Sequence, residues 1–225
     1  MRRRSFIFLA ALFALPFKAL AQQFQYGELN PPQPTESKDK IEVIEFFWYG
    51  CPHCYSLEPY IEAWLKKLPP DVEFRRVPAV FNTRWAHDAA IFYTLEAMGL
   101  ADKLHRPLFD AIHKSNLRTD NEAALSEWLQ KNGVDPKKFM DTMKSFGVQS
   151  KLKRATQQTV AYKIDGTPAM AVAGRYTVSA DQAVDHLQHA LLRAAGGRRP
   201  GRHGTQAEIS IANAGRHHRR LLGHR

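Results

Sequence analysis

The sequence predicts an α/β protein in which a mixed sheet is built from two halves, βαβ and ββα, with an all-helical block between them. Three observations support this fold class. Two β-rich apolar runs flank a helical period near the start, helical periodicity fills the middle, and two short strands precede a last helix. The 225 residues, 44% of them hydrophobic, suit one globular domain with an insertion.

Strand and helix signals define the first half of the sheet. The β-rich run Ile41–Phe47 predicts a buried strand, and Gly50 marks the turn after it. Apolar residues at helical spacing predict a helix over Ser56–Leu68, which Pro59 should kink. A second strand is expected over Val72–Val80.

Capping signals divide the middle of the chain into helices. Asp120 and Asp135 are expected to begin helices that end before Gly133 and at Gly147. The predicted helices span Trp85–Met98, Asp102–Lys114, 120–132, 135–147 and Ser150–Tyr162.

The second half of the sheet begins with a hairpin signal. Strands over Ala169–Ala173 and Tyr176–Val178 are joined across Gly174-Arg175. Ser179 is then expected to cap a closing helix over Ala180–Ala195.

The basic character of the chain lies at its two ends. The formal net charge is +10, with +4 before residue 22 and +6 beyond residue 197, which leaves residues 22–197 neutral. Nucleic-acid binding by the body is therefore not expected. The tail, residues 197–225, is either an electrostatic arm for nucleic acid or anionic lipid, or a disordered appendage from a frameshifted or readthrough end. We favour the appendage.

The first 21 residues have the order of a secretory signal peptide. Three arginines precede the apolar run Phe6–Leu15, and Ala19-Leu20-Ala21 offers a cleavage site. Ten apolar residues are too few to span a bilayer. The sequence therefore predicts an exported protein cleaved near Ala21, by either the Sec or the twin-arginine route.

The chain has two cysteines, Cys51 and Cys54, and their spacing favours redox chemistry. A bridge between them closes a four-residue loop, which the chain-entropy model values at about 2 kcal/mol, less than the roughly 3 kcal/mol of a fifteen-residue loop. A haem site needs histidine after the second cysteine, where this chain has Tyr55. Structural zinc needs two more ligands, and copper(I) stays open as a soft-metal alternative.

Cys51 is expected at the junction between a strand and a helix. Free N–H groups and the positive end of the helix dipole stabilise an anion there, which lowers the pKa of a thiol. Cys54 lies one turn further along and should be more buried. This arrangement suggests attack by Cys51 and resolution by Cys54.

Two motifs resemble the DsbA family of periplasmic thiol–disulfide oxidoreductases. The first is Glu45-Phe46-Phe47-Trp48-Tyr49-Gly50-Cys51-Pro52-His53-Cys54-Tyr55, and the second is Gly166-Thr167-Pro168-Ala169-Met170. The resemblance covers about residues 35–195 and implies a thioredoxin-like fold with a helical insertion. It implies segments 22–83 and 163–196 for the thioredoxin-like domain and 84–162 for the insertion.

The resemblance also implies a role for each matching residue. Cys51 is the expected nucleophile and Cys54 the resolving thiol of a Cys51–Cys54 disulfide, which Pro52 and His53 tune. Glu45 corresponds to a buried acid near Cys54 that relays protons. Thr167 and a cis Pro168 are expected to offer a backbone edge to an extended substrate peptide. Alone, His53 fits an exposed helix residue, Glu45 a water-facing strand residue and Pro168 a trans turn proline.

The expected function is a monomeric periplasmic dithiol oxidase without cofactor or metal. It would donate its disulfide to reduced exported proteins and be reoxidised by a DsbB-type, quinone-linked membrane oxidase. A disulfide isomerase or reductase and a soft-metal (copper) chaperone using Cys51, Cys54 and His53 are the alternatives. Isomerases of the DsbC type have an N-terminal dimerisation domain, for which the roughly twenty residues before the sheet leave little room.

Overall fold

The computed structural model describes residues 26–179. The predicted signal peptide, the closing helix over Ala180–Ala195 and the basic tail lie outside the described residues. Within them, no helix combines the length and apolar character that a membrane span requires.

The described strands form one mixed sheet of five, in the order β1-β5-β4-β2-β3. Strands β2 and β3 are parallel, and the other neighbouring pairs are antiparallel. The predicted fold class is confirmed, with one short edge strand, β1, that the sequence pattern did not indicate. The strands are β1 (Gly27–Glu28), β2 (Ile41–Phe47), β3 (Val72–Pro78), β4 (Ala169–Val172) and β5 (Tyr176–Ser179).

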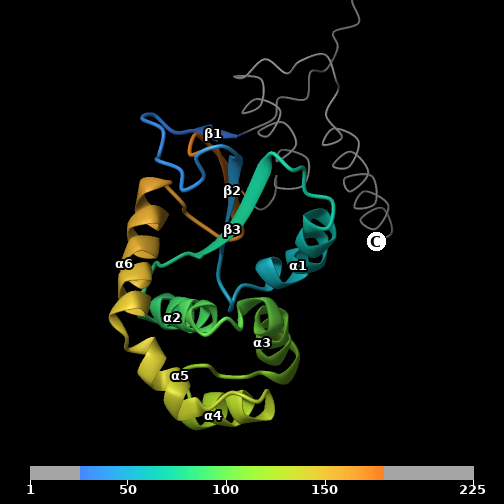
Figure 1. Cartoon of the computed structure of the whole chain (residues 1–225), viewed down its shortest axis with the longest axis vertical. Coiled ribbons are helices and arrows are strands. Elements are labelled where there is room, and N and C mark those ends of the chain that lie inside the picture. The colour runs from blue at the N-terminus through green and yellow to red at the C-terminus, as the bar shows by residue number, and fades with distance from the viewer. Residues whose placement is uncertain (1–25, 180–225) are drawn as a thin grey trace, which may run out of the picture.

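Six helices accompany the sheet. In Figure 1, α1 lies to one side of the strands, α2 to α5 gather below them, and α6 runs from that block back towards the sheet. The helices are α1 (Pro52–Leu65), α2 (Thr83–Ala97), α3 (Ala101–Ser115), α4 (Glu122–Lys131), α5 (Pro136–Met143) and α6 (Phe146–Ala161). The predicted helical block between two halves of a sheet is therefore present.

Two predicted boundaries are wrong because other side chains cap the helices. Asn121 caps α4 by accepting a hydrogen bond from the N–H of Ala124, whereas Asp120 accepts from Arg118 instead. Ser145 begins α6 by accepting from the N–H of Val148, so α5 already ends at Met143. Gly147 lies inside the first turn of α6 and ends no helix.

The helix that follows the cysteine motif also differs from its predicted span. It starts at Pro52 and ends at Leu65, so it begins four residues earlier and ends three residues earlier than expected. Cys51 is the N-cap and Pro52 is preorganised for the first helical position, which explains the early start. The helix continues through Pro59 as one element.

The predicted hairpin of β4 and β5 is present, but its turn is centred one residue earlier than the expected Gly174-Arg175. Ala173 and Gly174 both have positive φ, and the N–H of Arg175 donates to the C=O of Val172. Gly174 is also required because a Cβ there would collide with the backbone carbonyl of Gln33. The turn thus fixes the register that brings β4 beside β2.

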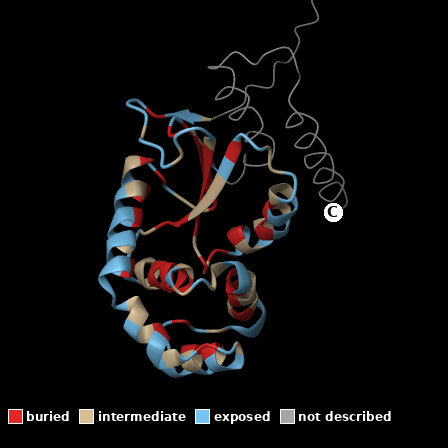
Figure 2. Cartoon of the chain, viewed as in Figure 1, coloured by how far each residue is buried: buried red, intermediate tan, exposed pale blue. Residues whose placement is uncertain are grey.

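Strand β2 is the centre of the core and is covered on both faces. One hydrophobic cluster joins the sheet to the helical block, and a smaller one joins it to α1. Val43, Phe46 and Phe47 have no exposed area. Burying such a side chain contributes roughly 1.5–3 kcal/mol. Figure 2 shows this burial along β2 and on the inner sides of α2 and α3.

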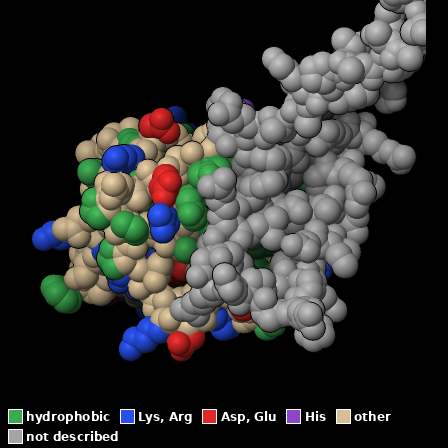
Figure 3. Space-filling view, turned by 90° about the horizontal axis from the view of Figure 1, so that it is seen from above, with side chains coloured by type: hydrophobic (Ala, Val, Ile, Leu, Met, Phe, Trp, Pro, Cys, Tyr) green, Lys and Arg blue, Asp and Glu red, His purple; other side chains and the backbone are tan. Residues whose placement is uncertain are grey.

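Charged side chains of both signs are mixed on the visible part of the surface. In Figure 3, Lys and Arg side chains lie among Asp and Glu on the described face turned to the viewer. This agrees with the neutral balance of residues 22–197. On that face, the described body therefore has no large area of a single charge sign.

Candidate active site

The turn between β2 and α1 places Cys51 at the start of a helix. Strand β2 ends at Phe47, and Cys51 then caps α1 with an extended backbone conformation. The N–H of Cys51 donates to the C=O of Trp48, which closes the turn. The first N–H groups of α1 therefore point towards the Cys51 sulfur, as the strand-to-helix prediction required.

Aromatic packing holds the turn in place. Trp48 stacks on Trp85 of α2 with ring centroids 4.3 Å apart, and its Nε1 donates to Asp88 at 2.8 Å. Gly50 is needed because a Cβ there would collide with the Trp48 indole. The helical block thus fixes the backbone that precedes Cys51.

The Cys51 thiol is buried, with 6% exposed area, and is surrounded by hydrogen-bond donors. The Cys54 N–H lies 3.5 Å from Cys51 Sγ. Hydrogen bonding from the Cys54 thiol and N–H, the Thr167 side chain and the His53 N–H lowers the pKa of Cys51 to about 5, against the opposing effect of burial. Cys51 is therefore mostly a thiolate at neutral pH.

Cys54 has the opposite electrostatic environment. Its side chain has no exposed area, and burial raises its pKa far above that of a free thiol. The hydrogen bond that it gives to Cys51 and the nearby charge of Glu45 raise it further. Both cysteines are free here, and the two opposite pKa shifts favour an ionised Cys51 beside a protonated Cys54.

The second motif lies beside the first. In the thiol form, Cys51 Sγ donates to the C=O of Thr167 at 3.2 Å, across 116 positions of sequence. The Thr167–Pro168 peptide bond is cis, which confirms the expectation for Pro168. A second cis bond, Asn30–Pro31, was not predicted. Thr167 is half-buried and Pro168 is buried.

Pro52 and His53, between the cysteines, are both exposed. Pro52 occupies the first position of α1, where a missing N–H costs nothing. His53 contributes to the low pKa of Cys51 through its backbone N–H. The structure thus gives His53 a backbone contact with the Cys51 sulfur.

Glu45 is fully buried and does not face water. The parallel register sets it directly opposite Arg76 of β3, and Arg76 Nε donates to Glu45 Oε2 at 3.1 Å. Burial raises the pKa of Glu45 to about 8, against the lowering effect of Arg76. At neutral pH, Glu45 is therefore mostly a neutral acid. When it ionises, its negative charge raises the pKa of Cys54.

Three further residues complete the buried polar cluster, and the sequence analysis missed them. Arg76 also donates to Glu58 of α1 at 3.0 Å, and His105 of α3 lies 3.2 Å from the same carboxylate. Glu58 is four residues after Cys54 and thus on the same inward face of the helix, a signal that could have found it. His105 offered no such signal, because only the tertiary fold brings α3 to α1.

Helix α3 makes two more polar contacts with the motif. His113 Nε2 lies 2.8 Å from the backbone carbonyl of Tyr49, and Tyr55 Oη donates to Asp110 at 2.8 Å. The rings of Tyr55 and His113 are stacked with centroids 4.7 Å apart. The inserted block therefore holds the motif from both α2 and α3.

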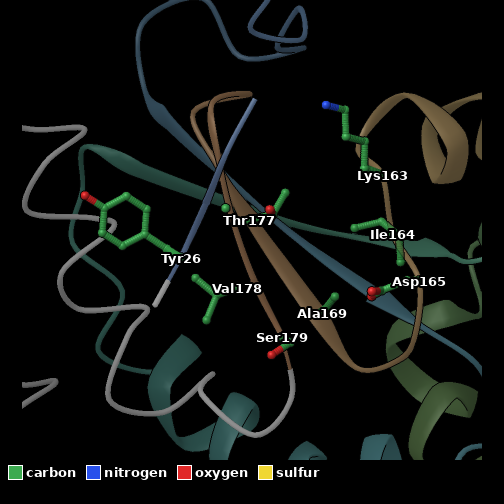
Figure 4. A pocket seen from close by; sticks show the side chains of 9 residues that line it. Tyr26, Lys163, Ile164, Asp165, Ala169, Thr177, Val178 and Ser179 are labelled. Carbon is green, nitrogen blue, oxygen red and sulfur yellow. The ribbon is translucent and has the colours of Figure 1, made fainter. Parts of the chain in front are cut away.

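A pocket of about 260 Å³ lies at the sheet edge, apart from the cysteines. Figure 4 shows Thr177 and Ser179 on the strand side of this pocket and Lys163 and Asp165 on the loop side, with the Tyr26 ring turned away from that loop. Neither Cys51 nor Cys54 lines this pocket. Among residues 26–179, no cluster of three or more His, Cys, Asp or Glu side chains has the arrangement of a metal site.

The fold and site together define a class: a thioredoxin-fold protein disulfide oxidoreductase with a helical insertion and a redox-active C-x-x-C pair. Residues 71–192 match the family model of the DSBA-like thioredoxin domain. The thiol:disulfide interchange protein DsbA of Azotobacter vinelandii is 47% identical over 152 residues, which cover 68% of this chain and 71% of that protein. That of Bordetella parapertussis is 45% identical over 168 residues, covering 75% and 79%.

Solved structures agree with the sequence comparisons. The crystal structure of Pseudomonas aeruginosa DsbA superimposes with a TM-score of 0.71 at 36% identity, over 77% of this chain and 94% of that one. DsbA from Xylella fastidiosa gives a TM-score of 0.71 at 29% identity, over 76% and 95%. The chain belongs to the DsbA family.

Proposed function

We propose that this chain is a periplasmic dithiol oxidase that donates a Cys51–Cys54 disulfide to newly exported proteins. A DsbB-type, quinone-linked membrane oxidase is the proposed source of its oxidising equivalents. The signal-like residues 1–21 and the names of its relatives support the periplasmic assignment. We also propose the domain boundaries 22–83, 84–162 and 163–196, which agree with helices that start at Thr83 and end at Ala161.

The difference between the two sulfurs carries this proposal. The pKa of Cys51 is about 5, whereas burial raises that of Cys54 far above its usual value. A stabilised Cys51 thiolate favours the reduced form of the protein and therefore makes its disulfide a strong oxidant. A disulfide with only a structural role does not require its two cysteines to differ in pKa.

The proposed reaction balances as a two-electron exchange. A client thiolate attacks Cys51 Sγ of the disulfide, the S–S bond breaks, and Cys54 leaves and takes up a proton. A second client thiolate then attacks the client sulfur of the mixed disulfide, and Cys51 leaves as a thiolate. The client loses two electrons and gains a disulfide, while the enzyme becomes a dithiol.

Glu45 has the position and protonation state to serve this reaction. With a pKa of about 8, it holds a proton at neutral pH close to the sulfur that must receive one. During reoxidation the same carboxylate accepts the proton that Cys54 releases. We propose Glu45 as the acid and base of the Cys54 step.

Client binding is proposed at the loop before β4. Thr167 and Pro168 border Cys51, and the Thr167 carbonyl oxygen lies 3.2 Å from Cys51 Sγ. An extended client peptide can replace that contact with backbone hydrogen bonds of its own, in the manner of an added strand. Pro52 and His53, next to Cys51 in the chain, are exposed and can also contact a client.

Two assays on the same protein test the proposal. The oxidised protein should oxidise a reduced two-cysteine peptide stoichiometrically, and the reduced protein should reduce insulin poorly. Efficient insulin reduction without peptide oxidation would indicate a reductase or isomerase instead. Stoichiometric copper(I) binding in an anaerobic titration, with no peptide oxidation, would indicate a metal chaperone.

A further inference from the structure

His105 occupies a fully enclosed position between the active-site turn and the buried charges. It has 6% exposed area, and its ring is edged by Phe47, Phe92 and Phe109 at centroid distances of 5.2, 5.9 and 5.1 Å. Such packing fixes the orientation of the ring. The two ring nitrogens of His105 therefore have fixed partners, which are Glu58 and Tyr49.

Those two partners determine the tautomer of His105. Nε2 lies 3.2 Å from Glu58 Oε1, and Nδ1 lies 2.9 Å from Tyr49 Oη. A carboxylate only accepts, so Nε2 carries the hydrogen, and Nδ1 then accepts from the tyrosine hydroxyl. Burial lowers the pKa of His105, which agrees with this neutral form.

A single arginine serves two buried carboxylates in this cluster. Arg76 contacts both oxygens of Glu58, at 3.0 and 3.3 Å, but only Oε2 of Glu45, at 3.1 Å. Glu45 Oε1 has no hydrogen-bond partner within residues 26–179, whereas Glu58 has a second donor in His105. Two close carboxylates with one cation favour a state in which one of them is protonated.

We propose that His105 is a positioning residue that, by donating to Glu58 and accepting from Tyr49, keeps the cluster's proton on Glu45 beside Cys54. The proposal rests on the proposed role of Glu45 in the Cys54 step. The hydrogen bond from His105, together with the charge and hydrogen bonds of Arg76, keeps the pKa of Glu58 below its usual value despite burial, while that of Glu45 is about 8. Without the His105 donor, Glu58 becomes the better proton acceptor.

Other charges face this cluster from each packed element. Glu58 and Glu62 of α1 and Arg76 of β3 act on His105, and Glu58, Arg76 and Cys51 act on Glu45. Tyr49 is faced by Arg76, Glu58, Asp88 and Glu96. Arg76 and His105 are the groups of this set that donate hydrogen bonds to Glu58, so removing His105 leaves that carboxylate dependent on a shared arginine.

The direct test is carboxyl titration by ¹³C NMR in the reduced full chain, with glutamate labelled at Cδ. Glu45→Gln and Glu58→Gln assign the two signals. In the unchanged protein, the Glu45 signal should titrate near pH 8, and that of Glu58 should stay ionised through the neutral range. In His105→Phe, Glu58 should titrate in the neutral range and the Glu45 midpoint should fall by about one pH unit or more.

Matched variants separate this effect from simple loss of packing. His113→Phe removes the other α3 histidine that contacts Tyr49 and should leave both carboxyl titrations unchanged. His105→Gln can both donate to Glu58 and accept from Tyr49, so it should restore the original order. Tyr49→Phe removes the donor to Nδ1 and should move Glu45 in the same direction as His105→Phe by a smaller amount.

The reaction supplies a second readout. At pH 7, oxidised His105→Phe should react with a reduced peptide about tenfold more slowly, and the alkaline limb of its rate profile should move to lower pH. Unchanged carboxyl titrations in folded His105→Phe would overturn the inference. Should His105→Phe not fold, unchanged titrations in Tyr49→Phe would overturn it. A protein that oxidises no peptide but titrates as expected would instead overturn the proposed function alone.

Discussion

The two ends of the Cys51–Cys54 pair are surrounded by different kinds of structure. On the Cys51 side, the N-terminal turn of α1 and the Thr167 loop form hydrogen bonds with the Cys51 sulfur, and Pro52 and His53 are exposed. On the Cys54 side, Glu45, Arg76, Glu58 and His105 form a buried polar cluster. The first side stabilises the negative charge of the Cys51 thiolate. The second side holds the proton that Cys54 takes up or releases.

The largest effects should come from the cysteines themselves. Cys51→Ala should abolish thiol exchange, because the remaining sulfur is buried and protonated. Cys54→Ala should instead accumulate mixed disulfides with clients, because no second thiol resolves them. Non-reducing gels after incubation with a reduced client measure both. Mixed disulfides formed through Cys54 in Cys51→Ala would reverse the assignment.

The buried cluster predicts different costs for its two carboxylates. Glu58→Gln removes the anion that Arg76 and His105 both contact, and breaking such a buried pair costs about 3–5 kcal/mol of unfolding free energy. Glu45→Gln mimics a group that is already mostly neutral at pH 7, since its pKa is about 8, and should cost about 1 kcal/mol or less.

Urea melts at pH 7 and pH 9 measure this contrast. Because the pKa of Glu45 is raised by folding, its contribution is complete at low pH and is lost as pH rises through about 8. Between pH 7 and pH 9, the cost of Glu45→Gln should therefore shrink by about 1 kcal/mol, because the unchanged protein loses its remaining contribution from the protonated carboxyl. Equal costs for the two substitutions at pH 7 would contradict the assignment of the proton.

Substitution at the client edge should affect binding more than folding. Thr167→Arg should weaken client binding with little loss of stability, since Thr167 is half-buried and borders Cys51. We expect a raised KM for peptide oxidation and a melting curve close to that of the unchanged protein. Thr167→Ser is the matched control, because it keeps the hydroxyl and the backbone carbonyl. A normal KM for Thr167→Arg would remove the loop from the proposed groove.

The smallest effect is expected from the basic tail. Deleting residues 197–225 removes a net charge of +6 and should lower the isoelectric point while leaving peptide oxidation unchanged. The body before the tail contains all of the residues assigned to the reaction. A large loss of activity in the shortened chain would instead make the tail part of the domain.

Local signals explain what could be predicted from the sequence. The apolar run of β2, the helix after Gly50 and the hairpin at Gly174 each depend on neighbouring residues, and all three are present. Asp120 failed as a cap because Arg118 and Arg84 bind it, and that choice depends on packing between helices.

The buried half of the site depends on contacts between distant elements. The burial of Glu45 could be predicted only from the family resemblance, because the strand pattern alone also allows this side chain to face water. Arg76 needs the β2–β3 register, and His105 needs α3 to pack against α1. Periodicity in one element cannot specify such contacts, although the i, i+4 relation of Cys54 and Glu58 does indicate a shared face.

The most direct test of the account is the stability of the reduced and oxidised forms as a function of pH. A pKa of about 5 for Cys51, against roughly 8.5 for a free thiol, stabilises the folded reduced form by about 3 kcal/mol at pH 7. The four-residue disulfide loop stabilises the oxidised form by only about 2 kcal/mol. Because this pKa is lowered by folding, the thiolate contribution is complete above the unfolded pKa and vanishes as pH falls through about 5.

Denaturant melts of both forms at pH 7 and pH 4 measure this difference. The reduced protein should be the more stable form at pH 7, and the order should reverse near about pH 6, so that the oxidised protein is more stable at pH 4. An oxidised form that is more stable at pH 7 would contradict the account and indicate a reductase or a structural bridge.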